Sequence, residues 1–193
     1  MRMLLIGAPG SGKGTQAAVL SAFFGVPHIS SGQLLRDYMT RNTMEGRQAS
    51  AYVDLGDLVP DELVEATLRE PIRRAAEQGG YILDGFPRTL RQARHMQLDP
   101  AASQFAVEVA VHLYVPHDDL VHRLLARARG VDDSRAVVEH RLEVFEQHTS
   151  PMLGFYEKRG ELVVMDAAGP VDQVTAALLA ELKAFQLAPT RDS

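Results

Sequence analysis

The sequence predicts an α/β fold in which five parallel strands form one sheet and helices cover both of its faces, giving three layers. Five short apolar runs predict the strands, and the segments between them are long enough to hold helices. The expected strands span residues 2–6, 26–29, 81–84, 109–114 and 162–165. Because connections between parallel strands are almost always right-handed, we expect helices on both faces of the sheet.

Apolar spacing also predicts individual helices, because side chains three or four residues apart share one face of a helix. Two such faces are Val138, Leu142, Phe145 and Thr149 in one helix, and Val171, Val174, Leu178, Leu182 and Phe185 in another with an early proline at Pro170. A third helical pattern consists of Val64, Leu68 and Ile72. It is interrupted by Pro71, which lacks a backbone N–H. We therefore expect that helix to kink or to be relayed at Pro71.

The composition is typical of a single globular domain spanning residues 1–193. Of the 193 residues, 46% are hydrophobic and 23% are charged, which is enough apolar material for a sizeable core. The net charge of -5 argues against a general nucleic-acid binder, which needs a basic face. The chain has no cysteine, and no apolar run approaches the ~20 residues that cross a bilayer. We expect a cytoplasmic protein with neither a nucleic-acid nor a membrane partner.

A glycine-rich turn directly follows the first expected strand. It reads Gly7-Ala8-Pro9-Gly10-Ser11-Gly12-Lys13-Gly14-Thr15. Glycines let the backbone wrap closely around an anion, the following helix directs N–H groups at it, and Lys13 adds a full positive charge. The turn therefore predicts a P-loop that binds the phosphates of a nucleoside triphosphate. Gly14 replaces the usual Ser or Thr after the lysine, so we expect magnesium to be held less directly.

A second set of polar residues follows the strand at 81–84. It comprises Asp84, Gly85, Arg88, Thr89 and Gln92. An aspartate at a strand end suits magnesium or its bound waters, a guanidinium binds phosphate oxygens with two parallel hydrogen bonds, and an amide can both donate to and accept from a base edge. Further arginines stand at 36, 123, 127, 129 and 141. On an acidic chain this set indicates phosphoryl transfer between two aligned nucleotides, which requires neutralised charge.

With these motifs the chain resembles the adenylate kinases, of the nucleoside monophosphate kinase family, in the version with a short lid. The resemblance is nearly end to end. It is carried by the P-loop from Gly7 to Gln16, the monophosphate segment from Ser30 to Arg36, the motif from Asp84 to Thr89 with Gln92, and Asp132-Asp133 with Arg141-Leu142 in the lid and the helix after it.

The resemblance implies a reaction and a role for each matching residue. The reaction is reversible transfer of the terminal phosphoryl group of magnesium-ATP to AMP, giving two ADP with no covalent enzyme intermediate. The implied ATP-binding residues are Gly10, Ser11, Gly12, Lys13, Gly14, Thr15, Arg123, Arg127 and Gly169. The implied AMP-binding residues are Ser31, Arg36, Asp57, Leu58, Val59, Gly85, Arg88, Gln92 and Arg141. The implied catalytic set is Lys13, Arg36, Arg88, Arg123, Arg127 and Arg141, and Asp84 would bind Mg2+ through water.

Within these sets, Arg36 and Arg88 would hold the AMP phosphate, and Arg127 and Arg141 the group in transfer. Arg123 would stack on the ATP adenine. The resemblance also implies a monomer with two mobile parts, an AMP-binding subdomain at about residues 30–60 and a short lid at about residues 123–136. Closure of these parts would exclude water and so prevent hydrolysis of ATP.

Three positions depart from the family's pattern. Gln33 replaces an aspartate that accepts hydrogen bonds from metal-bound water, so we expect weaker organisation of magnesium and more reliance on Asp84. Gly130 stands where the lid has an arginine, and we expect Arg129 to substitute. Ser31 replaces threonine but keeps the hydroxyl, which favours AMP as the acceptor.

The residues leave two alternatives open. One is a related kinase with UMP or CMP as the acceptor. The other is a P-loop nucleotide switch that has no small-molecule acceptor, against which Arg36, Arg88 and Gln92 argue.

Overall fold

A computed structural model describes residues 1–53, 55–127 and 134–187, without the side chains of residues 127, 186 and 187. Its sheet has five strands, all parallel, in the order β2-β3-β1-β4-β5. The strands are β1 (Arg2–Ile6), β2 (His28–Ser30), β3 (Tyr81–Asp84), β4 (Val109–Tyr114) and β5 (Leu162–Asp166). The predicted fold class is therefore confirmed.

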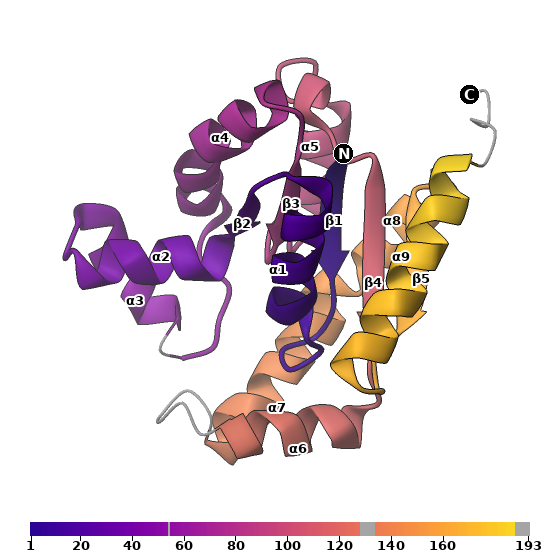
Figure 1. The fold of residues 1–193 in the computed structure, drawn as a ribbon. Coiled ribbons are helices and arrows are strands. Elements are labelled where there is room, and N and C mark those ends of the chain that lie inside the picture. Colours follow the sequence, from indigo (N-terminus) through magenta and orange to yellow (C-terminus); the bar gives the residue numbers. More distant parts are fainter. Residues whose placement is uncertain (54, 128–133, 188–193) are drawn as a thin grey trace.

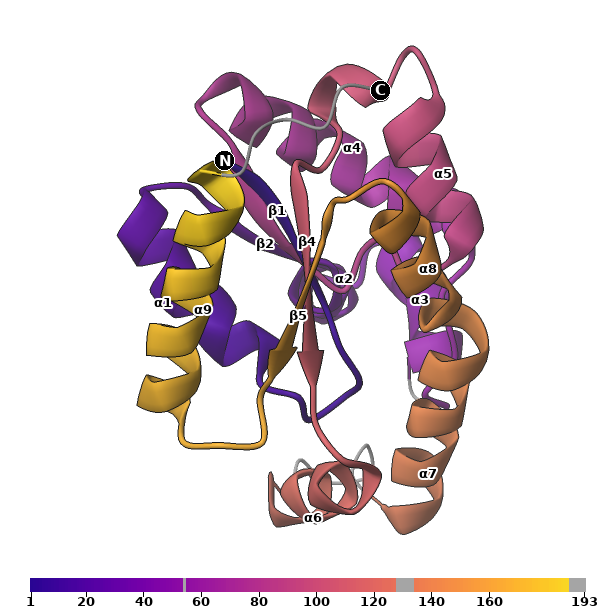
Figure 2. The same cartoon turned by 90° about the vertical axis from the view of Figure 1, so that its right-hand side faces the viewer.

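Helices connect the strands and enclose the sheet. They are α1 (Lys13–Phe24), α2 (Ser31–Thr40), α3 (Met44–Val53), α4 (Asp61–Glu77), α5 (Leu90–Leu98), α6 (His117–Arg127), α7 (Arg135–Val144), α8 (Pro151–Lys158) and α9 (Val171–Leu187), with a 3-10 turn η1 (Ser103–Phe105) and a π-helical turn η3 (Phe145–Thr149). Figure 2 shows α1 and α9 on one side of the sheet and α5 and α8 on the other. In Figure 1, α2 and α3 project to one side of the sheet.

The core lies on both faces of the central strands. Met3, Leu4, Ile82 and Ala110 are fully buried, as expected for parallel strands that are covered on both faces and are therefore apolar almost throughout. The register pairs Leu5 of β1 with Asp84 of β3. The glycine-rich turn and the segment after Asp84 therefore leave neighbouring strands at the same edge of the sheet, where open α/β sheets bind their ligands.

The predicted helix faces are largely confirmed. Val138, Leu142, Phe145 and Thr149 are all buried, although the last two lie in the π-helical turn rather than in α7. Of the C-terminal set, Val174, Leu178 and Leu182 are buried, whereas Val171 is 53% exposed. Val171 is the first residue of α9, and the start of this helix leaves its side chain in solvent.

Of the two outcomes expected at Pro71, a kink or a relay, the structure excludes the relay. α4 runs from Asp61 to Glu77 as one helix with Pro71 inside it. Its buried residues include Val64, Leu68 and Ile72 on both sides of the proline. Burial of this apolar face stabilises the helix more than the missing proline hydrogen bond destabilises it.

Within residues 1–53, 55–127 and 134–187, we find no helix of the length and apolar character needed to cross a membrane.

Candidate active site

The glycine-rich turn leads into α1 at Lys13, with Gly12 as its N-cap. Gly10 and Gly12 have φ angles of 86° and 90°, in the left-handed region that other L-residues rarely adopt. The first turn of α1 has no acidic residue, so the positive end of the helix is available to an anion. The buried Ser11 hydroxyl finds no hydrogen-bond partner in the described part of the chain. The turn therefore has the geometry of a phosphate site.

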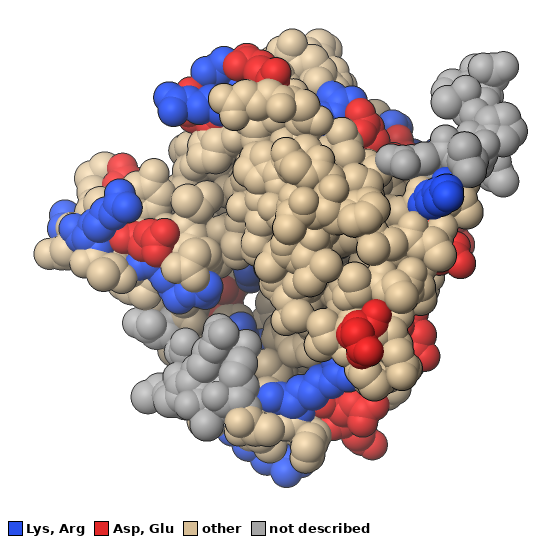
Figure 3. Space-filling model, viewed as in Figure 1, with Lys and Arg blue, Asp and Glu red and all other residues tan. Residues whose placement is uncertain are grey.

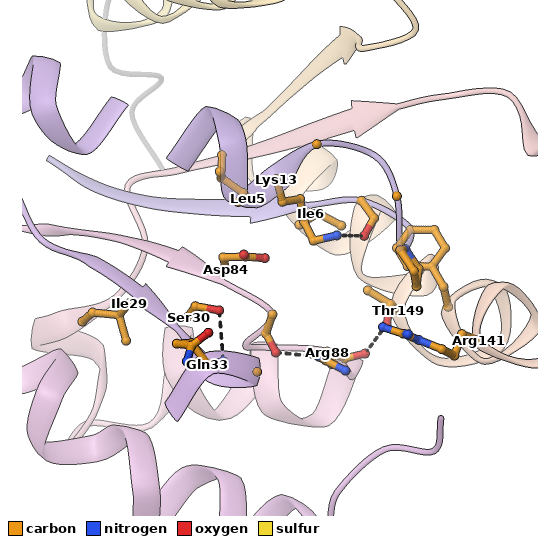
Figure 4. Close-up of a pocket in the computed structure, with 18 of the residues that line it drawn as sticks. Leu5, Ile6, Lys13, Ile29, Ser30, Gln33, Asp84, Arg88, Arg141 and Thr149 are labelled. Carbon is orange, nitrogen blue, oxygen red and sulfur yellow. Dashed lines mark hydrogen bonds between the residues drawn. The ribbon is translucent and has the colours of Figure 1, made fainter. Parts of the chain in front are cut away.

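Lys13 extends back over the turn that precedes it. Its Nζ donates hydrogen bonds to the carbonyls of Gly7 and Ala8, at 2.6 and 3.0 Å, and Figure 4 draws one of these two bonds. Gly7 is required for close packing, because a Cβ there would lie 2.5 Å from Ser11 Oγ and 2.9 Å from the Leu113 carbonyl.

One large cleft, with a volume of about 930 Å³, lies over this turn. Its walls bring together charged residues from separate elements: Lys13, Arg36, Asp84, Arg88, Arg123 and Arg141. Thr15 and Gly14 also line it. In the space-filling view the surface is hollowed between the left-hand helices and the rest of the molecule, and blue atoms lie at the margin of the hollow (Figure 3). Residues dispersed over more than a hundred positions of sequence thus meet in one cleft.

Asp84 is the only acid among the described residues that line the cleft. Burial by itself would raise the pKa of its carboxyl, but the His28 imidazole and the charges of Lys13 and Arg88 outweigh this effect and lower the pKa below its ordinary value. Because its pKa is lowered, the Asp84 carboxyl is ionised at neutral pH, as a binder of metal-bound water must be. His28 Nε2 lies 3.7 Å from Asp84 Oδ2, beyond good hydrogen-bond distance.

The guanidinium of Arg88 lies within electrostatic reach of Asp84 and of two further arginines of the cleft, Arg141 and Arg36. The pKa of Arg88 is lowered by the surrounding protein and by the charges of Arg141 and Arg36, while Asp84 raises it. Arg88 is exposed to solvent within the cleft, so water limits this shift and the group stays cationic. Its Nε donates to the Gly85 carbonyl at 2.7 Å. Figure 4 shows Arg88 and Arg141 in the same part of the cleft.

A smaller cavity lies beside this cluster. Its lining comprises Ser31, Leu35, Leu58, Val59, Val64, Gly85, Arg88 and Gln92. Two of the residues expected to bind AMP, Ser31 and Gln92, line this cavity. Ser31 Oγ donates a hydrogen bond to the Gly85 carbonyl at 2.6 Å, and Gln92 is 97% shielded from solvent. This lining combines hydrogen-bonding and apolar groups, the combination that a site for a nucleotide base requires.

On the opposite side, Arg123 reaches the loop before α9. Its two terminal nitrogens donate to the carbonyls of Ala167 and Ala168, at 3.1 and 2.6 Å. Gly169 follows these residues directly. Arg123 and Gly169, both expected to bind ATP, therefore lie close together.

Some predicted residues have another environment. Asp57 does not line either cavity, and its carboxylate lies 2.7 Å from His140 Nε2. Arg127 ends α6, but its side chain lies outside the described part of the structure. Arg129, Gly130, Asp132 and Asp133 also lie outside the described residues.

The structure adds contacts that the sequence did not predict. Thr149 Oγ1 donates to the Arg88 carbonyl at 2.8 Å (Figure 4). Gln33 Nε2 donates to Asp37 Oδ1 at 2.8 Å, and its Oε1 accepts from Arg36 at 3.1 Å. The spacing of these three residues, i, i+3 and i+4 on a helix, is a signal that could have indicated the second network.

Known proteins resemble this chain over almost its whole length. Residues 5–161 match the family model described as "Adenylate kinase". The chain is 40% identical over 186 residues to an adenylate kinase of Thermobifida fusca (strain YX), with 95% of this chain and 98% of the relative covered. It is 42% identical over 182 residues to an adenylate kinase of Mycobacterium sp. (strain MCS), with 94% and 99% covered. It is 39% identical over 188 residues to an adenylate kinase of Trichodesmium erythraeum (strain IMS101), with 94% and 97% covered. The fold, the cleft and these relatives agree: the chain belongs to the adenylate kinase family.

Proposed function

We propose that this protein catalyses the reversible, magnesium-dependent transfer of the terminal phosphoryl group of ATP to AMP, giving two ADP. The observation that supports the proposal is the presence of two separate groups of cationic side chains in one cleft. One is the glycine-rich turn with Lys13, and the other is the cluster of Arg36, Arg88 and Arg141. A nucleotide switch needs only the first site, whereas a kinase with a nucleotide acceptor needs both.

On the donor side, the N–H groups at the start of α1 and the ammonium of Lys13 would hold the ATP phosphates. To do so, Lys13 must exchange the Gly7 and Ala8 carbonyls for phosphate oxygens. Arg123 would lie against the adenine, where a guanidinium can stack on the ring face. Gly169 would border the same base.

On the acceptor side, Arg36 and Arg88 would bind the AMP phosphate. Ser31, Gly85 and Gln92 would surround its base, with the backbone of Asp57, Leu58 and Val59 on the other side. Arg141 lines the cleft with these residues and, together with Arg127, would bind the transferred group.

The chemical step requires little more than alignment and charge stabilisation, because negative charge is spread over the equatorial oxygens of the transferred group. Preorganised cations such as Arg88 and Arg141 stabilise that charge without reorganising, and a single such group accounts for roughly 10²–10³ in rate. We propose that residues 30–60 and 123–136 close over the nucleotides and exclude water, so that AMP rather than water accepts the phosphoryl group.

The residues at the cleft suit a magnesium ion. Mg2+ prefers hard oxygen ligands and retains several waters. Asp84 offers an ionised carboxylate in the cleft, and Thr15, which also lines the cleft, offers a hydroxyl. When bound, the ion would neutralise phosphate charge. Asp84 would accept hydrogen bonds from its waters, and the neutral Gln33 amide would contribute less than an aspartate there.

We also propose, on the expectations from composition and family, that the enzyme is a cytoplasmic monomer. Light scattering coupled to size-exclusion chromatography tests the proposed monomeric state. A measured mass that is a multiple of the chain mass would contradict it.

The acceptor is tested by comparing AMP, UMP, CMP and GMP with ATP and magnesium. We expect AMP to have the highest kcat/KM, because a site built around hydrogen bonds penalises an analogue that leaves them unpaired. A higher value for UMP or CMP would instead support the related kinase.

A further inference from the structure

The amide of Gln92 is held at both ends by partners of opposite character. Gln92 Oε1 accepts a hydrogen bond from the backbone N–H of Arg88 at 2.7 Å. Gln92 Nε2 donates a hydrogen bond to Asp61 Oδ1. A backbone N–H can only donate and a carboxylate can only accept. The two partners therefore determine which end of the amide is oxygen and which is nitrogen, a choice that is otherwise ambiguous.

Asp61 is itself held in place. It is the first residue of α4, 31 positions from Gln92, and its side chain is only 17% exposed. Arg91 Nε donates to its other oxygen, Oδ2, at 2.6 Å, so that one carboxylate oxygen serves Arg91 and the other serves Gln92. This division leaves Asp61 Oδ1 directed to the Gln92 amide.

The held amide keeps two hydrogen-bonding positions for a ligand. The Nε2 group has two hydrogens and Oε1 has two lone pairs, and one of each is used by Asp61 and Arg88. One N–H donor and one oxygen acceptor remain on a residue that lines the small cavity with Ser31 and Val59. Because Gln92 is buried, a ligand that leaves these positions unpaired is penalised.

That pair of positions matches one kind of base edge. Adenine presents a ring-nitrogen acceptor at N1 and an amino donor at its 6-position. Hypoxanthine and guanine present the reverse pattern, an N1–H donor and a 6-oxo acceptor. To pair with a 6-oxo purine the amide would have to turn over, which would place NH2 against the Arg88 N–H and oxygen against the Asp61 carboxylate. Both contacts would then be repulsive.

We infer that Asp61 is a positioning residue that sets acceptor specificity: by fixing the orientation of the Gln92 amide, it makes the cavity select a 6-amino over a 6-oxo purine monophosphate. The inference rests on the proposed function, since it assigns how the acceptor site of that reaction reads its base. Asp61 acts through Gln92 and does not itself contact the substrate.

The test compares AMP with IMP, because these two acceptors differ only at the edge in question. Initial rates are measured with ATP and magnesium for the wild type, Asp61→Ala and Asp61→Ser, with the nucleoside diphosphates separated by chromatography. Where transfer to IMP is too slow, its inhibition constant against AMP replaces the rate. The ratio of kcat/KM for AMP to that for IMP is the readout, and it does not depend on how much of a preparation is folded.

We expect Asp61→Ala to lower this ratio about tenfold, the factor that ~1.4 kcal/mol represents. The loss should come from a higher KM for AMP with kcat nearly unchanged, because binding of the base is uniform through the reaction. Asp61→Ser should also lower the ratio, since a hydroxyl can either donate or accept.

Glu62→Ala is the matched control. Glu62 is the other acidic residue in the first turn of α4. Its side chain is 83% exposed and lies 3.6 Å from the Arg91 guanidinium, a weak ion pair. It should leave the ratio unchanged. The inference is overturned if the wild type phosphorylates AMP and the ratio of kcat/KM for AMP to that for IMP stays within twofold of the wild-type value in both Asp61→Ala and Asp61→Ser. If the wild type does not phosphorylate AMP, the proposed function itself fails.

Discussion

His140 Nε2 lies 2.7 Å from Asp57 Oδ1, and this contact joins α7 to the segment that precedes α4. The neighbouring Gly56 packs against the same helix, since a Cβ there would lie 2.8 Å from Arg141 Cγ. The segment whose backbone we propose to border the AMP base therefore touches the helix that carries a proposed phosphate-binding arginine. Movement of one is coupled to the position of the other.

His140→Ala should weaken AMP binding by releasing this segment from α7. Both side chains are nearly half exposed, at 44% and 43%, so the contact contributes ~0.2–1 kcal/mol and KM for AMP should rise about 1.5- to 5-fold. KM for ATP should stay constant. His122→Ala, which removes an exposed histidine of α6, is the control. Equal KM values for AMP in His140→Ala and the wild type would show that the contact does not position the segment.

Thr149→Val should disturb Arg88. The substitution keeps the shape of the side chain but removes the hydrogen bond from Oγ1 to the Arg88 carbonyl, which should cost about 1 kcal/mol of stability. We also expect a lower kcat/KM for AMP, because this carbonyl belongs to the residue that would hold the acceptor phosphate.

Thr67→Val is the matched control for that variant. Thr67 Oγ1 donates a hydrogen bond to the Leu63 carbonyl at 2.7 Å within α4. Thr67→Val therefore removes the same kind of hydrogen bond at a site that has no contact with Arg88. Urea unfolding should show similar losses in the two variants, and steady-state kinetics should show a change only in Thr149→Val. A parallel change in both would mean that Thr149 acts through general stability.

Gln33→Asp should reduce the magnesium concentration needed for half-maximal rate. A carboxylate can accept hydrogen bonds from metal-bound water more strongly than a neutral amide. The same change breaks the hydrogen bond to Asp37 and places two acids four residues apart, which should slightly destabilise α2. Rates measured over a magnesium titration test the first effect, and an unchanged midpoint would refute weaker organisation of the metal by Gln33.

Glu70 of α4 should make a pH-dependent contribution to the free energy of unfolding. Hydrogen bonds from Arg73 and Arg74 lower the pKa of this exposed carboxyl to about 2. A group whose pKa is lower in the folded protein stabilises it above the unfolded pKa, and that contribution is lost as the pH falls toward the folded pKa. The difference in unfolding free energy between the wild type and Glu70→Gln should therefore be constant from pH 7 to about 5, decrease below that, and be reduced by salt. A difference that grows on acidification would contradict this assignment.

Strands and phosphate loop follow from local sequence, whereas the finer contacts of the cleft do not. The strand containing Ile82 is predicted because its residues are apolar and bounded by turn signals, and the turn at Lys13 is predicted because glycine spacing has a direct backbone meaning. The contacts of Asp61 with Gln92 and of Asp57 with His140 join residues 31 and 83 positions apart. Their existence depends on how whole helices pack, which no local pattern contains. From sequence alone, Asp61 is simply an acid that suits the start of a helix.

The proposed reaction is tested most directly by ADP formation from ATP and magnesium, with and without AMP, in the wild type and in Arg88→Ala. The account predicts ADP formation that requires AMP and that is lost in the variant, because Arg88 would hold the acceptor phosphate. ADP formed equally without AMP would contradict it and would indicate an ATPase or a nucleotide switch in place of a kinase.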